Sequence, residues 1–168
     1  MMYELKALSH SAIPAALAQA ERYRLLNEPA EAESICLDIL RIDPDHQEAL
    51  AMMVLALTDQ FPDGAHARIA AEAEQSVARI RDEYKRLYIM GIIRERRGKA
   101  VLRSHHPGSG LSAQEWLKEA MSCYERAEAI RPADNDEAVL RWNTCVRILT
   151  GMPAHEPDLH EFSAIQSE

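Results

Sequence analysis

A phrase that occurs twice constrains this chain more than any other feature. "LRIDPDHQEAL" at residues 40–50 and "AIRPADNDEAV" at residues 129–139 each place a proline and several acidic residues between two apolar runs. Proline cannot continue a helix, and a following Asp is a common first cap of a new one. Each phrase therefore predicts a joint between two helices, and the repetition predicts that one helical unit is stacked on another.

The composition favours helices over sheets. The chain has 168 residues, of which 47% are hydrophobic and only 5% aromatic, with six Gly and eight Pro. Ala, Glu, Leu and Arg dominate, and these residues favour helices. A chain of this length suits one domain with a substantial core. We expect a soluble, all-α protein.

Charge and hydropathy limit the partners and the location. A formal net charge of −8 repels phosphate backbones, so we expect no nucleic-acid partner. The first residues, "MMYELKALSH", include Glu4 and Lys6 and do not read as a signal peptide. The longest apolar stretch, "ALAMMVLAL", stops at Thr58, well short of the ~20 residues of a membrane span. We expect a cytoplasmic protein that does not bind membranes.

The first two predicted helices form an antiparallel pair. Two amphipathic segments, residues 14–26 and 29–42, are separated by only two residues, which favours opposite directions. Each begins with a proline, which is tolerated in a first helical turn, and Pro44 ends the second. Asp45 and Asp63 are the predicted caps of the next two helices.

The apolar and small residues recur at a regular spacing. A published repeat pattern, W-x₂-L-G-x₂-Y…A-x₃-F…P, has the same offsets as a set in the first pair: Ala16, Gln19, Ala20, Tyr23, Ala32, Cys36 and Pro44. A second set lies 34 residues later, at Leu50, Met53, Val54 and Leu57. This spacing resembles that of the tetratricopeptide repeat.

Two further sets extend the resemblance to about residue 150. The third comprises Leu87, Met90, Gly91 and Arg94, with Ala120, Tyr124, Ala127 and Pro132 in its partner helix; the fourth comprises Val139, Trp142, Asn143 and Val146. The resemblance implies a right-handed α-solenoid of antiparallel helix pairs with a terminal capping helix. Residues 14–150 would hold about three and a half repeats, after an N-terminal extension at 1–13 and before a flexible tail at 151–168.

The third pair contains an insertion. Thirty-three residues separate Leu87 from Ala120, where 16 separate the corresponding residues of the first unit. "SHHPGSGL" at 104–111 is the predicted insertion loop, and a capping box from Ser112 to Glu115 predicts the start of the next helix. We expect both helices of this pair to be longer than the others and to protrude.

Other boundaries follow from glycines and from local pattern. Gly98 is predicted to mark a turn and Gly151 a helix C-cap. The segment at 61–80 is helical, but its apolar residues Ala70, Ala73, Val77 and Ile80 permit more than one register. In the tail, an alternative to disorder is one short docked turn that presents Leu159, Phe162 and Ile165.

The resemblance also implies a binding surface. In such solenoids the first helix of each pair lines a concave face that binds peptides. The predicted groove residues are Leu17, Glu21, Arg24, Ala51, Leu55, Tyr88, Ile92, Leu140, Thr144 and Arg147, and the same steps also reach Thr58 and Glu95. Some of these could instead be ordinary core residues. The central positions lack the Lys and Asn with which some family members clamp acidic chaperone tails.

The predicted function is therefore that of a scaffold. We expect a non-enzymatic adaptor that holds an apolar or amphipathic segment of another protein. The alternative is a structural protein that forms homo-oligomers through exposed helix faces. No phosphate loop, nucleophile elbow or zinc-binding helix motif is present in the sequence, and we expect no catalytic residue, metal or cofactor.

Three other features have a simple structural interpretation and a functional alternative. His105 and His106 are predicted to be ordinary loop residues, although two imidazoles are a partial metal site. Cys36, Cys123 and Cys145 are predicted to be buried, the alternative being a reactive, low-pKa thiol at Cys145. The basic run "RERRGKAVLR" at 94–103 is predicted to be a solvated helix surface, and the alternative is a site for an acidic peptide or nucleic acid.

Overall fold

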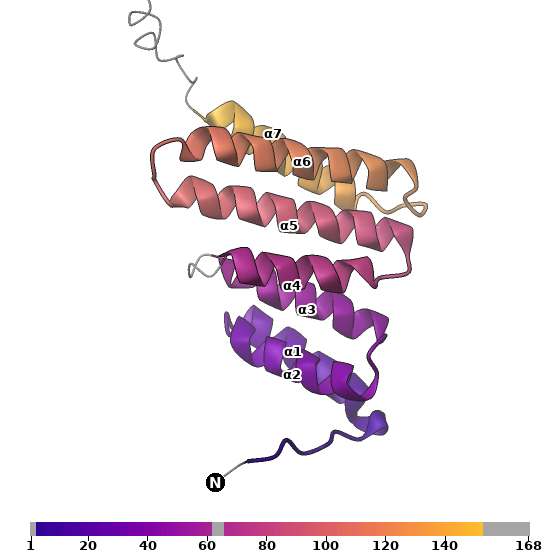
Figure 1. Cartoon of the computed structure of the whole chain (residues 1–168). Coiled ribbons are helices and arrows are strands. Elements are labelled where there is room, and N and C mark those ends of the chain that lie inside the picture. The colour runs from indigo at the N-terminus through magenta and orange to yellow at the C-terminus, as the bar shows by residue number, and fades with distance from the viewer. Residues whose placement is uncertain (1–2, 62–65, 153–168) are drawn as a thin grey trace, which may run out of the picture.

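The structure is a computed structural model that describes residues 3–61 and 66–152. These residues form a short 3₁₀ turn and seven α-helices, with no strand among them, so the all-α prediction is confirmed. The helices stack along one direction (Figure 1). In chain order the elements are η1 (His10–Ala12), α1 (Ile13–Leu25), α2 (Pro29–Ile42), α3 (Gln47–Asp59), α4 (His66–Ala78), α5 (Glu83–Arg103), α6 (Ser109–Ala129) and α7 (Glu137–Gly151).

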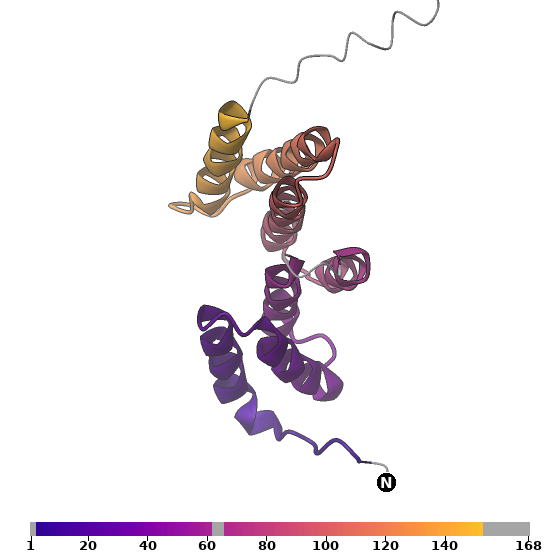
Figure 2. The same ribbon diagram turned by 90° about the vertical axis from the view of Figure 1, so that its left-hand side faces the viewer.

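The helices lie in two rows. Viewed nearly end-on, α1, α3, α5 and α7 form a curved inner row, and α2, α4 and α6 lie on its outer side (Figure 2). Each helix packs against its neighbours in sequence, and α3 also contacts both α1 and α5. The side chains of the inner row are therefore brought onto one shared face.

The turn between α1 and α2 is short because of its backbone conformation. Asn27 has a φ of 61°, in the left-handed region that Asn tolerates better than most residues. The amide of Glu28 then donates to the carbonyl of Tyr23 at 2.8 Å, which satisfies one of the last carbonyls of α1. The prolines of the first turns of α1 and α2 lie as predicted.

The start of α3 differs from the prediction by one residue. The ring Nδ1 of His46, and not the carboxylate of Asp45, accepts a hydrogen bond from the amide of Ala49 at 3.3 Å. Asp45 instead forms an ion pair with Arg79 at 3.2 Å. The other predicted cap, Asp63, lies outside the described residues.

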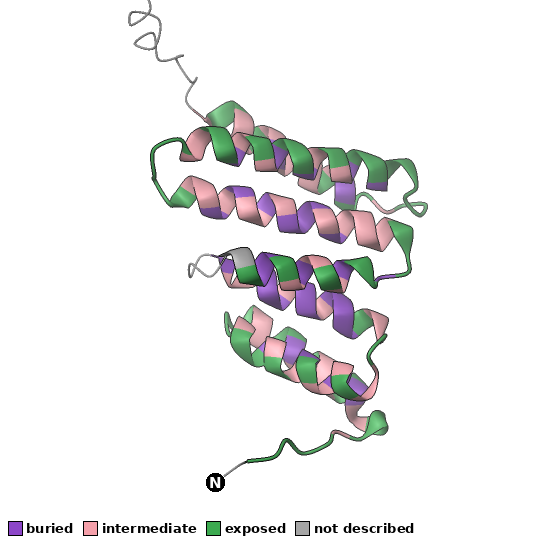
Figure 3. Cartoon of the chain, viewed as in Figure 1, coloured by how far each residue is buried: buried purple, intermediate pink, exposed green. Residues whose placement is uncertain are grey.

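Helix α3 forms the centre of the core. Eight of its 13 residues are buried, and purple dominates this helix in Figure 3. The residues of segment 61–80 whose register was ambiguous are all buried, Ala70, Ala73 and Val77 within α4 and Ile80 just after it. Ala32 and Ala120, the small residues of α2 and α6, are fully buried as the repeat spacing predicts.

The α5–α6 pair is longer than the other pairs, as predicted. Both helices have 21 residues, whereas the others have 13 to 15. Their connecting loop extends past the ends of the shorter helices (Figure 1). Helix α6 begins at Ser109, three residues before the predicted capping box at Ser112, because Gly108 at φ 79° provides the turn that starts it. The loop is correspondingly shorter than 104–111.

Two glycine predictions are wrong. Gly98 lies inside α5, and a Cβ atom there would approach Cγ of Leu117 to 3.1 Å and the carbonyl of Ala113 to 3.2 Å. This glycine allows close approach of α6 and does not form a turn. Gly151 is the last residue of α7, and Met152 occupies the C-cap position. The tail interpretations, including Leu159, Phe162 and Ile165, concern residues outside the described part of the chain.

Within residues 3–61 and 66–152, none of the helices combines the length and the hydrophobicity that crossing a membrane requires.

Candidate functional site

Six of the ten predicted groove residues line one cavity of about 650 Å³ on the inner row: Leu17, Glu21, Ala51, Leu55, Tyr88 and Ile92. We call this cavity the groove. It draws its lining from α1, α3, α5 and α7, together with Asp82, the N-cap of α5. The remaining lining residues, which the repeat steps did not identify, are Ala18, Glu48, Met52, Asp82, Tyr84, Lys85, Ile89 and Glu137.

The groove has half-buried walls and a buried floor. Leu17 and Leu55 are partly exposed, whereas Ala51 and Ile92 are only 6% and 2% exposed. Tyr88 is half-buried, and its ring stacks on that of Tyr84 at a centroid distance of 6.0 Å. Ala51 and Ile92 therefore serve the core as well as the groove, as the core interpretation of these positions expected.

Acidic side chains surround one side of the groove. Glu48 and Glu137 lie in the first turns of α3 and α7, and Asp82 is the N-cap of α5, where its carboxylate accepts from the amide of Lys85 at 2.6 Å. Carboxylates are stabilised near helix N-termini by the helix dipole. All three line the groove, so its rim carries negative charge where these helices begin.

A second cavity, of about 240 Å³, adjoins the groove and shares Tyr88 and Glu137 with it. We call it the connecting cavity. Two further predicted residues, Leu140 and Thr144, line it, as does Glu95. Arg147 is exposed and lines neither this cavity nor the groove.

Glu95 is a fully buried carboxylate with several donors. The hydroxyl of Tyr124 donates to it at 2.7 Å, Lys99 donates from the next helical turn, and Arg141 of α7 donates at 3.2 Å. Burial alone would raise its pKa, but these donors together hold the pKa of Glu95 below its usual range. Glu95 is consequently ionised at neutral pH, and its contacts hold α5, α6 and α7 together.

The third cavity, of about 320 Å³, is the basic recess. Its charged lining residues are Arg96, Lys99, Arg103, Arg141 and a single carboxylate, Asp59. It shares Lys99 and Arg141 with the connecting cavity, so the three hollows lie next to one another. Thr58, the further residue on α3 that the repeat steps reach, also lines it.

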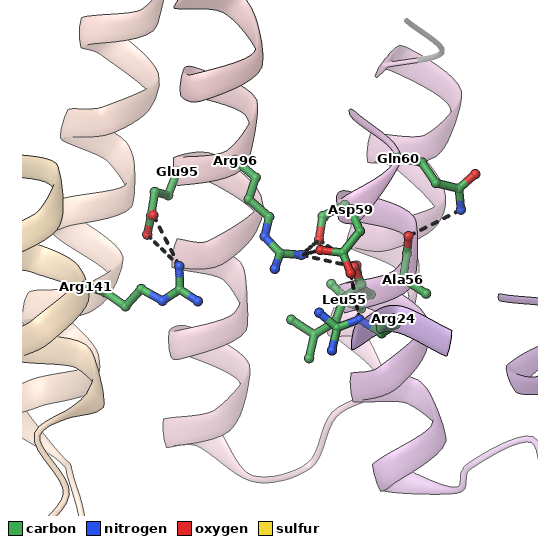
Figure 4. Close-up of polar contacts among 10 residues, drawn as sticks. Arg24, Leu55, Ala56, Asp59, Gln60, Glu95, Arg96 and Arg141 are labelled. Carbon is green, nitrogen blue, oxygen red and sulfur yellow. Dashed lines mark hydrogen bonds and ion pairs between the residues drawn. The ribbon is translucent and has the colours of Figure 1, made fainter. Parts of the chain in front are cut away.

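Arg96 is fixed in the recess by contacts with the end of α3. It donates to the carbonyl of Leu55 at 3.0 Å and to the hydroxyl of Thr58 at 2.5 Å, and it pairs with Asp59 at 2.7 Å. Arg24, another predicted groove residue, pairs with the same carboxylate at 2.7 Å (Figure 4). Its role is thus to hold Asp59 in place from α1.

The basic run at 94–103 is not the solvated surface that its composition predicted. Arg94 pairs with Glu74 at 2.9 Å, and the guanidinium of Arg97 lies 4.0 Å from the ring centroid of Trp116. Arg96, Lys99 and Arg103 line the recess. The sequence shows the cluster of cations in this run, but it does not show their partners, which lie on other helices.

The remaining chemical alternatives find no support in the geometry. Cys36 and Cys145 are buried as predicted, and burial raises the pKa of both thiols to about 12, so the alternative of a low-pKa thiol at Cys145 is wrong. Cys123 is only partly buried. In the described parts of the chain, no three His, Cys, Asp or Glu side chains are grouped as metal ligands.

Comparison of the chain with models of known protein families, with curated protein sequences and with solved structures finds no match.

Proposed function

We propose that this chain is a non-enzymatic interaction scaffold, a tetratricopeptide-like right-handed solenoid whose groove binds an apolar or amphipathic segment of another protein. The observation that carries the proposal is the groove itself. Three neighbouring helices of the inner row, α1, α3 and α5, contribute Leu17, Leu55 and Tyr88 to one accessible apolar surface. A surface built by repetition across helices suits an extended or helical peptide.

The solenoid part of the proposal is supported by equivalent residues at equivalent places. Ala20 in α1 and Gly91 in α5 occupy the same slot of the repeat pattern and are both buried, Gly91 against Tyr124 of α6. Ala32 and Ala120 occupy a second shared slot and are also buried. These contacts, together with the two-row arrangement in Figure 2, are what stacked copies of one unit would produce.

The size and chemistry of the groove indicate what it would hold. Its volume of about 650 Å³ lies within the range of pockets that bind small molecules or a few peptide side chains. Leucine and tyrosine walls favour apolar side chains, and a partly exposed aromatic in a hollow is a typical anchor of binding energy. The acidic rim at Glu48, Asp82 and Glu137 favours a cation beside them.

Selection from a random peptide display library tests the proposal. Peptides that bind the wild-type chain should bind a Leu55→Asp variant at least tenfold more weakly, because a charge would replace part of the groove wall. The matched control is Leu37→Asp on α2, where the side chain is 53% exposed and lies outside the groove. Equal loss in both variants, or loss in the control alone, would contradict a groove site.

Self-association is the second candidate, and exposed leucines at the first pair favour it. Leu25 is 83% exposed and Leu26 61% exposed, next to the α1–α2 turn. Analytical ultracentrifugation over a wide concentration range tests this alternative. A monomer at all concentrations would exclude it, and a dimer that a Leu25→Ser, Leu26→Ser variant abolishes would support it over the groove.

A further inference from the structure

The basic recess carries an excess of positive charge in a chain that is negative overall. Four cationic side chains line it, Arg96, Lys99, Arg103 and Arg141, against the single carboxylate of Asp59. The whole chain has a formal net charge of −8. A local excess of the opposite sign in a hollow focuses the field on whatever enters it.

The carboxylates around the recess are already shared between cations. Asp59 pairs with both Arg24 and Arg96 at 2.7 Å, and Glu95 pairs with both Lys99 and Arg141. Four cations thus share two carboxylates.

Two further charged groups lie in or beside the recess. Arg103 forms no ion pair within residues 3–61 and 66–152, and Glu137, which faces the connecting cavity from α7, forms none with Lys99 or Arg141. Of the four cations that line the recess, Arg103 is therefore the one without an ion-pair partner in the described part of the chain.

The recess is also preorganised. Three groups at the end of α3 hold the guanidinium of Arg96, so little side-chain freedom remains to be lost on binding. Burial lowers the pKa of Arg96, and the nearby charges of Arg24 and Arg141 lower it further against the opposing effect of Asp59. An arginine held in this way presents fixed donors that match an oxyanion.

We propose that the basic recess is an anion subsite that receives a carboxylate of the peptide bound in the groove. This inference rests on the proposed function of the groove. The connecting cavity shares lining residues with both the groove and the recess, so a peptide seated in the groove would have its end close to the recess. Phe61 and Ala100 supply an apolar part of the recess lining, which suits the methylene groups of an Asp or Glu side chain. The preferred ligand is therefore an apolar segment with an acidic residue at the recess end.

Titration of the full chain with sodium succinate, followed by the ¹⁵N–¹H signals of the arginine Nε groups, tests the subsite. Succinate should shift the signals of Arg96, Arg103 and Arg141 saturably, and sodium chloride at equal ionic strength should not. Arg103→Gln should weaken succinate binding at least fivefold, because it removes the unpaired cation. The matched control is Arg147→Gln, an exposed arginine of the inner row outside all three hollows, which should leave the affinity unchanged.

Each other outcome overturns the inference. Shifts that follow ionic strength alone, or equal affinities for wild type and Arg103→Gln, would show that the recess is not a specific anion site. Saturation with inorganic phosphate but not with succinate would replace the carboxylate assignment with a phosphate site. Succinate binding needs no peptide, so failure of the display selection and failure of this titration are separate results.

Discussion

The α1–α2 and α5–α6 pairs follow the same spacing but bury different chemistry. In the first pair, Ala20 and Cys36 occupy positions that Gly91 and Tyr124 occupy in the third, and all four residues are buried. The first pair is closed by small side chains on both helices. In the third pair, α5 has a glycine at this position, and the large ring of Tyr124 from α6 packs against it.

The exchange allows a polar contact that the first pair does not have. A Cβ atom at residue 91 would lie 2.3 Å from Cε1 of Tyr124, so only glycine leaves room for this ring. The hydroxyl of Tyr124 then reaches buried Glu95, which also binds Arg141 on α7. One repeat spacing can therefore support a joint of small side chains or a joint that connects three helices through one carboxylate.

The largest expected effect is loss of that carboxylate. Glu95→Gln should lower the free energy of unfolding by about 3 kcal/mol, because it leaves Lys99 and Arg141 without their buried counter-charge. Urea unfolding followed by circular dichroism measures the loss. The control near the first pair is Asp59→Asn. The side chain of Asp59 is 22% exposed, so this substitution should lower the free energy of unfolding by only about 1 kcal/mol. Equal losses of unfolding free energy in the two variants would contradict the view that the buried carboxylate of Glu95 matters more to stability than the partly exposed one of Asp59.

The same variant has a pH dependence of known sign. The pKa of Glu95 is lowered in the folded state, so its contribution is complete above its ordinary value of 4.5 and is lost as the pH falls through the lowered one. The stability gap between wild type and Glu95→Gln should therefore be widest at neutral pH and narrow below about pH 4.5. Urea titrations at pH 7 and pH 3.5 compare the two, and an unchanged gap would show that folding does not lower the pKa of Glu95.

Gly91→Ala should be the next most costly change. The added Cβ forces the anchored ring of Tyr124 to move, at a cost of about 2 to 3 kcal/mol. A double-mutant cycle sharpens the comparison, because Gly91→Ala should cost far less in a Tyr124→Cys background, which restores the small-on-small combination of the first pair. Additive losses would mean that the strain arises elsewhere.

Ala32→Leu and Ala120→Leu test the spacing that both pairs share. Each residue is fully buried, so each substitution should overpack a helix crossing and cost about 2 kcal/mol. Thermal midpoints measured by circular dichroism report the effect, with the exposed Ala30→Leu on α2 as the control. Midpoints as high as that of the control for both variants would contradict the repeat register.

Changes in the α5–α6 loop and in the α1–α2 turn should have the smallest effects on stability, and the loop should tolerate change better than the turn. Deleting His106 and Pro107 from the exposed α5–α6 loop should change stability by less than about 0.5 kcal/mol. Asn27→Ala in the tight α1–α2 turn should cost about 1 kcal/mol, because the residue has a φ of 61°. Limited proteolysis offers a second readout. We expect the first cleavage in the α5–α6 loop, and a first cleavage in the α1–α2 turn would contradict this expectation.

Most helices could be predicted from the sequence, because proline positions and repeat spacing are local signals. Gly98 was misassigned because a glycine can permit either a positive φ or a close approach, and only Leu117 on the facing helix distinguishes the two. The basic run was misassigned for a similar reason. Thr58, the partner of Arg96, lies 38 residues away, and Arg141, a partner of Glu95, lies 46 residues away.

The candidate site was predicted more successfully on α1, α3 and the first half of α5 than on α7. The repeat steps identified the residues that share the groove, including Leu17, Leu55 and Tyr88. On α7 they reached Leu140 and Thr144, which line the connecting cavity, and missed Arg141 one residue along. The recess depends on contacts between helices at long sequence separation, which periodicity within one helix does not encode.

The central claim is that the inner row binds a peptide, and methyl NMR tests it most directly. A peptide obtained by display selection is titrated into chain labelled at Ile and Leu methyl groups. The account predicts saturable shifts at Leu17, Leu55 and Ile92 in the groove, with Leu37 on α2 and Ile130 after α6 unchanged. Shifts confined to Leu37 and Ile130, with unchanged signals in the groove, would contradict it.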